Sequence, residues 1–237
     1  MKKHNFSAGP CILPKEVLKQ ASKAVLNFNN SNLSLIEISH RSKDFVEVME
    51  KAQILVKELL DLPKGYSVLF LQGGASTQFL MSFMNLLKTN GSAAYINTGT
   101  WSDKAIKEAE KFGEINIIGS SKDKNYSYIP KDLNCPEGMD YLHFTSNNTI
   151  FGTQFQDFPI VSSNTLLVCD MSSDIFSRKF DTSKFDLIYA GAQKNMGPAG
   201  TTLVIVKDEI LQQTGRDIPS MLDYSIHIKK ESMFNTP

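Results

Sequence analysis

Short apolar runs alternate with longer amphipathic segments along this chain, a pattern typical of alternating strands and helices. Apolar residues at helical spacing predict helices over 14–28, 43–60, 77–87 and 102–112, with Ser102 as the N-cap of the last. Short runs rich in apolar residues predict strands over 67–71, 93–96, 115–118, 141–144, 165–169, 187–190 and 202–206. These elements predict an α/β fold, three-layer α/β/α, with a mostly parallel seven-stranded sheet covered on both faces.

The composition is that of a globular protein. The chain has 237 residues, 41% of them hydrophobic, and its 25 basic and 25 acidic residues balance. This length suits one large domain or two small ones. A neutral chain lacks the basic excess of a nucleic-acid or membrane-surface binder, and its apolar runs are far shorter than the ~20 residues that span a bilayer. Neither a signal peptide nor a metal site is predicted, and the three scattered cysteines suit reduced thiols in the cytoplasm.

Ligands of parallel sheets bind at the carboxyl ends of the strands, so the segments that follow the predicted strands are the candidate ligand sites. The small residues of 73–77 lie between a strand and a helix, where backbone N–H groups can cradle a phosphate. An ordinary tight turn is the alternative, since the loop is neither a Walker A nor a GxGxxG motif. Trp101, the only tryptophan, follows the next strand, and it either stacks on a planar ligand or packs as an ordinary aromatic residue.

Two charged residues follow later strands. Asp170 ends a buried strand, where a carboxylate is costly unless it is paired, and it can hold a protonated ring nitrogen or serve as a turn or cap residue. Lys194 lies among small residues that restrict its solvation, which would lower its pKa and favour a role as an amine nucleophile; a solvated loop lysine is the alternative. A phosphate cradle, a stacking ring, a carboxylate and a secluded lysine together match the requirements of pyridoxal 5′-phosphate.

Several short motifs, in order along the whole chain, resemble those of the phosphoserine aminotransferases, which are fold-type I enzymes of the class V aminotransferases. The motifs are NFSAGP at 5–10, SHRS at 39–42, GGASTQF at 73–79, TGTWS at 98–102, NNTI at 147–150, CDMSS at 169–173, YAGAQKN at 189–195 and SMFNTP at 232–237. The resemblance implies the large domain of a pyridoxal-phosphate-dependent transferase, with the aspartate aminotransferase-like fold.

The resemblance also implies roles for individual residues. Lys194 would bind the cofactor covalently and move the substrate proton, and Asp170 would pair with the pyridine nitrogen. Further cofactor contacts would come from Ala75, Ser76, Trp101, Thr149 and Gln193, and from Asn235 and Thr236 of the neighbouring subunit in a homodimer. His40 and Arg41 would bind the phosphate of the substrate, because an arginine can clamp it bidentately.

The implied reaction transfers the amino group of L-glutamate to 3-phosphohydroxypyruvate and gives O-phospho-L-serine and 2-oxoglutarate. This is a step of serine biosynthesis, and many bacterial members also act in pyridoxine biosynthesis. The family continues past the NTP motif into a C-terminal domain that supplies an arginine for the substrate carboxylate. We therefore expect residues 1–237 to be the large domain of a truncated chain, with 1–30 as N-terminal segment and helix and 207–237 as the start of the connection.

Two alternatives stay open at this stage. Another fold-type I enzyme would need Asp170 and Lys194 but not the pair His40 and Arg41. A cofactor-binding remnant without activity would keep the fold and lack the residues of the C-terminal domain. Ser76, which stands where some family members have an arginine, does not exclude a phosphate site, because backbone amides can still hold the anion.

Overall fold

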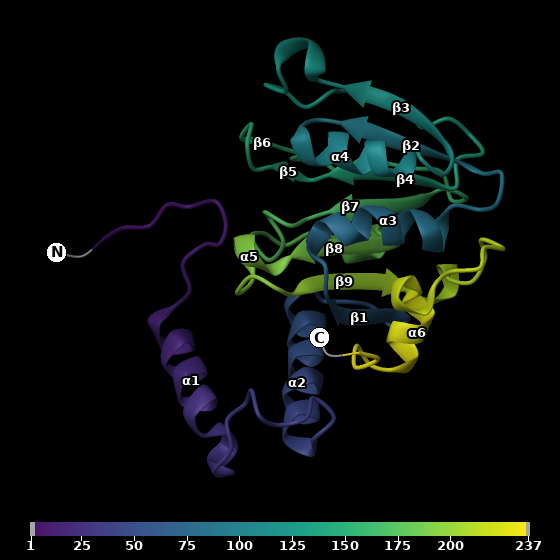
Figure 1. The fold of residues 1–237 in the computed structure, drawn as a ribbon. Coiled ribbons are helices and arrows are strands. Elements are labelled where there is room, and N and C mark those ends of the chain that lie inside the picture. The colour runs from purple at the N-terminus through teal and green to yellow at the C-terminus, as the bar shows by residue number, and fades with distance from the viewer. Residues whose placement is uncertain (1–2, 236–237) are drawn as a thin grey trace.

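A seven-stranded sheet forms the centre of the molecule (Figure 1), which we describe from a computed structural model for residues 3–235. Its strand order is β1-β9-β8-β7-β4-β2-β3. β9 runs antiparallel to β1 and to β8, and every other adjacent pair is parallel. The prediction of a mostly parallel seven-stranded sheet is therefore confirmed.

Each predicted strand is found within two residues of its expected bounds. The strands are β1 (Tyr66–Leu71), β2 (Ser92–Asn97), β3 (Glu114–Ser120), β4 (Tyr141–Thr145), β7 (Leu166–Asp170), β8 (Leu187–Gly191) and β9 (Thr202–Lys207). A separate hairpin of β5 (Asn147–Asn148) and β6 (Thr153–Gln154) is not predicted from the sequence. Two residues per strand are too few to leave a recognisable alternation of apolar and polar positions.

The four predicted helices are also present. The helices are α1 (Lys15–Leu26), α2 (Lys43–Leu59), α3 (Gly74–Leu86), α4 (Thr100–Ala109), α5 (Ala192–Asn195) and α6 (Tyr224–Lys229). Single 3₁₀ turns are η1 (Phe28–Asn30), η2 (Lys122–Lys124), η3 (Thr182–Lys184), η4 (Asp208–Ile210) and η5 (Ser220–Leu222). None of the helices within residues 3–235 is long and apolar enough to cross a membrane.

The predicted cap of α4 is wrong. The N-cap is Gly99, and Ser102 is the third residue of the helix. The Ser102 hydroxyl reaches back and accepts hydrogen bonds from the N–H groups of Thr98 and Gly99, each at 2.9 Å. A serine inside the first turn therefore accepts hydrogen bonds from backbone N–H groups of the loop that leads into the helix. The sequence pattern does not distinguish this role from that of an N-cap.

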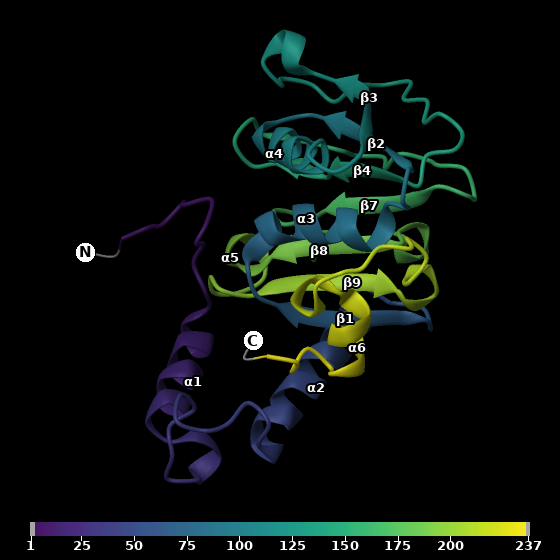
Figure 2. The ribbon, with the colours of Figure 1, turned by 45° about the vertical axis from the view of Figure 1, so that its right-hand side comes forward.

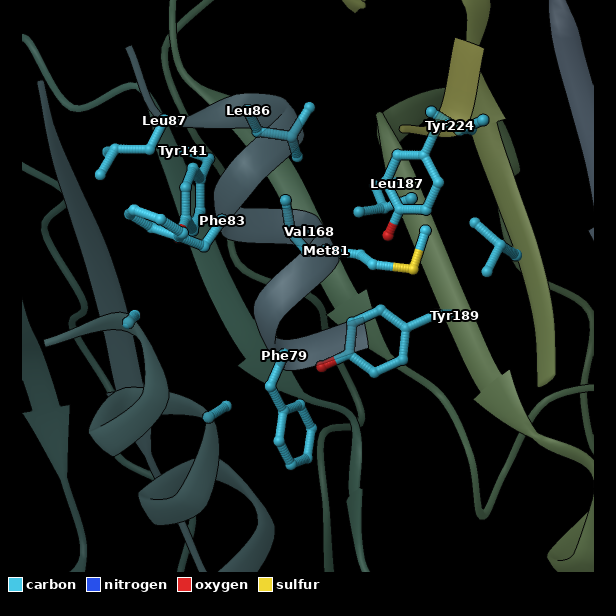
Figure 3. Close-up of a cluster of buried hydrophobic side chains, with 14 of the residues drawn as sticks. Phe79, Met81, Phe83, Leu86, Leu87, Tyr141, Val168, Leu187, Tyr189 and Tyr224 are labelled. Atoms are coloured by element: carbon cyan, nitrogen blue, oxygen red, sulfur yellow. The ribbon is translucent and has the colours of Figure 1, made fainter. Parts of the chain in front are cut away.

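Helices α3 and α4 cover one face of the sheet (Figures 1 and 2). Figure 3 shows the apolar cluster beneath α3, in which Phe79 of the helix lies beside Tyr189 of β8. The opposite face is covered by the end of α2 and by aromatic loop residues such as Phe155 and Phe185 rather than by a full layer of helices. Helix α1 lies apart from the sheet (Figures 1 and 2) and has no buried residue.

His143 of β4 lies within the face that α3 covers. Its ring is fully buried and stacks on Tyr95 with centroids 4.8 Å apart. Its Nε2 lies 2.7 Å from the hydroxyl of Tyr189, in hydrogen-bond contact. Burial away from water lowers the pKa of His143 to about 3, so the ring is neutral at physiological pH.

Leu187→Ala should lower the free energy of unfolding by about 2–5 kcal/mol, because it leaves a cavity in a core from which water is excluded. Leu187 is 0% exposed, whereas Leu59 is 66% exposed, so Leu59→Ala is the matched control and should change stability little. Urea denaturation followed by circular dichroism measures both. Equal losses in the two variants would contradict the core assignment.

The neutral, buried His143 should make the protein less stable in acid. An unfolded chain binds a proton on this histidine near pH 6.5, and the folded protein binds it only near pH 3. Between these values the unfolded state holds the extra proton, so unfolding becomes easier as the pH falls, by about 1.4 kcal/mol per pH unit. The advantage of the wild type over His143→Gln in urea denaturation should therefore shrink from pH 7 to pH 5. The same comparison with His4→Gln, at an exposed residue, should not change, and a constant difference for His143 would refute the assignment.

Candidate active site

The carboxyl ends of the parallel strands meet at one edge of the sheet, where α5 lies in Figure 1. Lys194 belongs to this four-residue helix, which directly follows β8. Its Nζ donates a hydrogen bond to Thr149 Oγ1 at 2.7 Å and lies 4.7 Å from the centroid of the Trp101 ring. The fold thus brings Thr149 and Trp101, which are 45 and 93 positions before this lysine in the sequence, to its amine.

The electrostatic environment of Lys194 agrees with the sequence prediction. Partial burial lowers the pKa of its amine below the usual 10.5, and the nearby carboxylate of Asp170 opposes part of this effect. A lowered pKa increases the neutral, nucleophilic fraction of the amine at a given pH. The predicted direction of the pKa shift is confirmed, and a freely solvated loop lysine does not describe this residue.

Asp170 ends β7 and is only 3% exposed. Its Oδ1 accepts hydrogen bonds from the N–H of Ser172 at 3.0 Å and from the Ser172 hydroxyl at 2.6 Å. Burial raises the pKa of this carboxyl, while the two bonds from Ser172 and the charge of Lys194 lower it. The carboxylate therefore closes a local turn and at the same time lies within electrostatic reach of the amine.

Ser172 also connects Asp170 to the end of β8, which leads directly into the helix of Lys194. Its Oγ accepts a hydrogen bond from the N–H of Gly191 at 3.0 Å, and Gly191 is the N-cap of α5. One hydroxyl thus connects the ends of β7 and β8. Ser172 is part of the CDMSS motif, but nothing in the sequence indicates these contacts.

The predicted phosphate loop leads directly into the first turn of a helix. Helix α3 has 13 residues and begins at Gly74, three residues earlier than expected. Gly73 caps it with φ of +88°, and a Cβ there would lie 2.0 Å from Thr77 Oγ1, so glycine is required. Ala75 and Ser76 lie in the first turn, whose N–H groups have no acceptor within the helix and favour an anion.

The N-terminal segment contacts the helix of Lys194, which the sequence motif alone did not indicate. The N–H of Cys11 donates to the carbonyl of Gln193 at 2.9 Å. A Cβ at Gly9 would lie 3.1 Å from Lys194 Cγ, so the backbone passes close to the lysine stem. The side chain of Gln193, expected to bind a phosphate, is partly exposed at this edge.

Arg41, one of the predicted substrate-binding residues, lies by the C-terminal residues of the described chain rather than at Lys194. Arg41 is exposed, and its Nη2 donates to the carbonyl of Phe234 at 3.5 Å. The Nε2 of His40 is buried and has no hydrogen-bond partner within residues 3–235. In the part of the chain that the structure describes, no direct bond joins either residue to Lys194.

Asn235 lies near the first turn of α3, because it lines a cavity of ≈ 230 Å³ that reaches Gly73 and Thr77. Thr236 lies outside the described residues.

The residues present fit pyridoxal 5′-phosphate. A helix N-terminus suits its phosphate, a buried carboxylate suits its ring nitrogen and a secluded amine suits its aldehyde. The Trp101 ring lies by the amine of Lys194, and its buried Nε1 has no hydrogen-bond partner among the described residues. These groups converge from β7 and β8 and from the loops after β1, β2 and β4.

Comparison with known proteins agrees with this geometry. The profile of the family described as aminotransferase class-V matches residues 3–237. The phosphoserine aminotransferase of Flavobacterium johnsoniae is 70% identical over 100% of this chain, which spans 66% of the length of that relative.

Solved structures give the same result. The phosphoserine aminotransferase of Bacillus circulans subsp. alkalophilus is 46% identical with a TM-score of 0.94, over 98% of this chain and 65% of its own. The pyridoxal-phosphate-bound phosphoserine aminotransferase of Trichomonas vaginalis is 35% identical with a TM-score of 0.92, over 100% of this chain and 67% of its own. In its sequence and in its fold, this chain belongs to the aminotransferase class-V family.

Proposed function

We propose that this chain is the cofactor-binding large domain, residues 1–237, of a cytoplasmic phosphoserine aminotransferase. The reaction transfers the amino group of L-glutamate through pyridoxal 5′-phosphate to 3-phosphohydroxypyruvate, giving O-phospho-L-serine and 2-oxoglutarate in serine biosynthesis. One observation carries the proposal: Lys194 Nζ lies 2.7 Å from Thr149 Oγ1 and 4.7 Å from the Trp101 ring, near the buried Asp170. The name of the 70% identical relative supports the choice of substrates.

Lys194 is proposed as the base that removes the proton from the substrate Cα and returns one to the product. When bound, pyridoxal 5′-phosphate supplies an electron sink for the charge that develops at that carbon. The lowered pKa of Lys194 supports this role, because a neutral amine can accept the proton. Thr149 orients the amine through its hydrogen bond.

Asp170 is proposed to keep a proton on the ring nitrogen of the cofactor. Its burial makes an unpaired negative charge costly, and a protonated nitrogen would offset that cost. Trp101 would stack on the ring, and the N–H groups of Ala75 and Ser76 would bind the phosphate together with Gln193.

Recognition of the substrate phosphate is assigned to His40 and Arg41. Arg41 is exposed, and its guanidinium can bind a phosphate through two parallel hydrogen bonds. Asn235 and Thr236 would reach the cofactor phosphate of a second subunit, which makes the proposed enzyme a homodimer. Helix α1 has exposed apolar side chains, such as Leu26 at 80% exposure, and these provide surface for contact between two subunits.

The cofactor should attach to Lys194 and to no other lysine. After incubation with pyridoxal 5′-phosphate and reduction with sodium borohydride, mass spectrometry of peptides should find the added mass on Lys194 only. Lys194→Ala should give no adduct and no visible absorbance. Lys104→Ala is the matched control, because Lys104 Nζ also lies by the Trp101 ring, at 4.9 Å, yet should not alter attachment. A colourless wild type with added cofactor would favour an inactive remnant.

Arg41→Ala should raise the KM for 3-phosphohydroxypyruvate by about 10- to 100-fold, the cost of a lost hydrogen bond to a charged group. The KM for L-glutamate should stay within about twofold. Lys43→Ala, which removes an 89% exposed cation two residues away, should leave both constants unchanged. The assay uses the complete protein with phosphorylated and unphosphorylated keto acids. An unchanged KM in Arg41→Ala, or equal turnover of both keto acids, would favour another aminotransferase.

A further inference from the structure

The carboxyl group of Asp174 connects two segments of the site. Asp174 is 6% exposed, and each of its oxygens accepts a hydrogen bond. Oδ1 accepts from the Ser146 hydroxyl at 2.5 Å, and Oδ2 accepts from Gln154 Nε2 at 3.1 Å. Ser146 directly precedes β5 and Gln154 ends β6, so one carboxyl group holds both strands at the base of this hairpin.

The hairpin that Asp174 holds carries Thr149 in its turn. Its strands pair over only two positions each, which gives the hairpin little stability of its own. Thr149 nevertheless has to place its Oγ1 within hydrogen-bond distance of Lys194 Nζ, and the observed distance is 2.7 Å. The bonds at the base therefore decide how well this hydroxyl is fixed.

Asp170 and Asp174 are the two ends of one short segment, residues 170–174. Asp170 lies near Lys194, and Asp174 is bonded to the hairpin that carries Thr149. The carbonyl of Asp170 accepts the N–H of Ser146 at 3.0 Å, and the Ser173 hydroxyl donates to the carbonyl of Asn147 at 2.9 Å. Residues 170–174 thus form a frame to which the start of the hairpin is attached. The Asp174 carboxyl adds the only side-chain bond that a described residue of this frame makes to β6.

A buried carboxyl group destabilises the folded state unless its oxygens are paired. Within residues 3–235, no lysine or arginine forms an ion pair with Asp174. Burial of such a group costs stability unless hydrogen bonds compensate, and an apolar side chain would fill the space at lower cost. The two hydrogen bonds to the hairpin are what an apolar side chain could not provide.

We propose that Asp174 is a positioning residue for amino transfer: its carboxyl group clamps both strands of the β5–β6 hairpin and thereby holds Thr149 against Lys194. This role rests on the proposed function, because it concerns the reaction assigned to Lys194. Asp174 itself acts through Thr149.

Hydrogen exchange of the cofactor-free protein tests the clamp without any assay of activity. In Asp174→Ala, amides of 147–154 should exchange at least about tenfold faster, while those of β8 keep their rate. Asp174→Asn keeps an acceptor for Ser146 and an amide that can pair with Gln154, so its exchange should stay close to that of the wild type. Asp157→Ala, which removes an exposed acidic residue, is the control and should change nothing. Unchanged exchange in Asp174→Ala would overturn the clamp.

Kinetics of the complete enzyme test whether the clamp serves the reaction. Asp174→Ala should lower kcat by about tenfold or more, because misplacement of a positioned group slows the chemical step, and should change KM for the keto acid by less than about twofold. In a Thr149→Val background the same substitution should cost little more, because its effect passes through Thr149. Additive losses, or a wild-type kcat in Asp174→Ala, would overturn the positioning role.

Two further results keep the test decisive. If Asp174→Ala does not fold, Gln154→Ala removes one of the two bonds from the hairpin side, and it should show the same changes at smaller size; no change would overturn the proposal. If the wild type does not aminate 3-phosphohydroxypyruvate, the proposed function fails, whereas the exchange experiment still decides whether Asp174 holds the hairpin.

Discussion

A buried carboxyl group and a partly buried amine at the same edge of the sheet are the constraint on which the rest of the site depends. Removal from water acts on both in the same way, by destabilising the charged form: it raises the pKa of Asp170 and lowers that of Lys194. Each charge partly offsets the cost of the other, although no direct hydrogen bond between them is described. Neighbouring groups must therefore fix both side chains, and Ser172 and Thr149 supply the bonds that do so.

The topology of the sheet explains how so many separate segments reach one place. β7 and β8 are parallel neighbours, so Asp170 and the helix of Lys194 leave the sheet at the same edge. The loops after β1, β2 and β4 open at that edge as well, and they bring the first turn of α3, Trp101 and Thr149. The strands that end at this edge are packed beneath α3 by fully buried apolar residues. The buried, neutral His143 lies among them.

The sequence predicted what depends on local pattern, and it missed what depends on few residues or on distant partners. Runs of apolar residues located all seven strands, and small residues after β1 indicated a candidate phosphate cradle. The β5–β6 hairpin, Asp174 and the contact of Gly9 with Lys194 left no comparable signal, because each is defined by a neighbour far along the chain. Ser102 was misread for the reverse reason: serine is favoured at the N-cap and also bonds backbone N–H groups from inside the first turn.

By itself, the sequence determined the α/β class, the order of the strands along the chain, and the residue types that suit pyridoxal phosphate, because apolar period and ordered motifs are properties of the chain alone. Only the tertiary structure decided which of these residues meet. It placed Thr149 and Trp101 at Lys194, and it left Arg41 by Phe234. The physical reason is that strand order in the sheet, the antiparallel insertion of β9 and the burial that shifts the pKa values all arise from contacts between segments that are distant in the sequence.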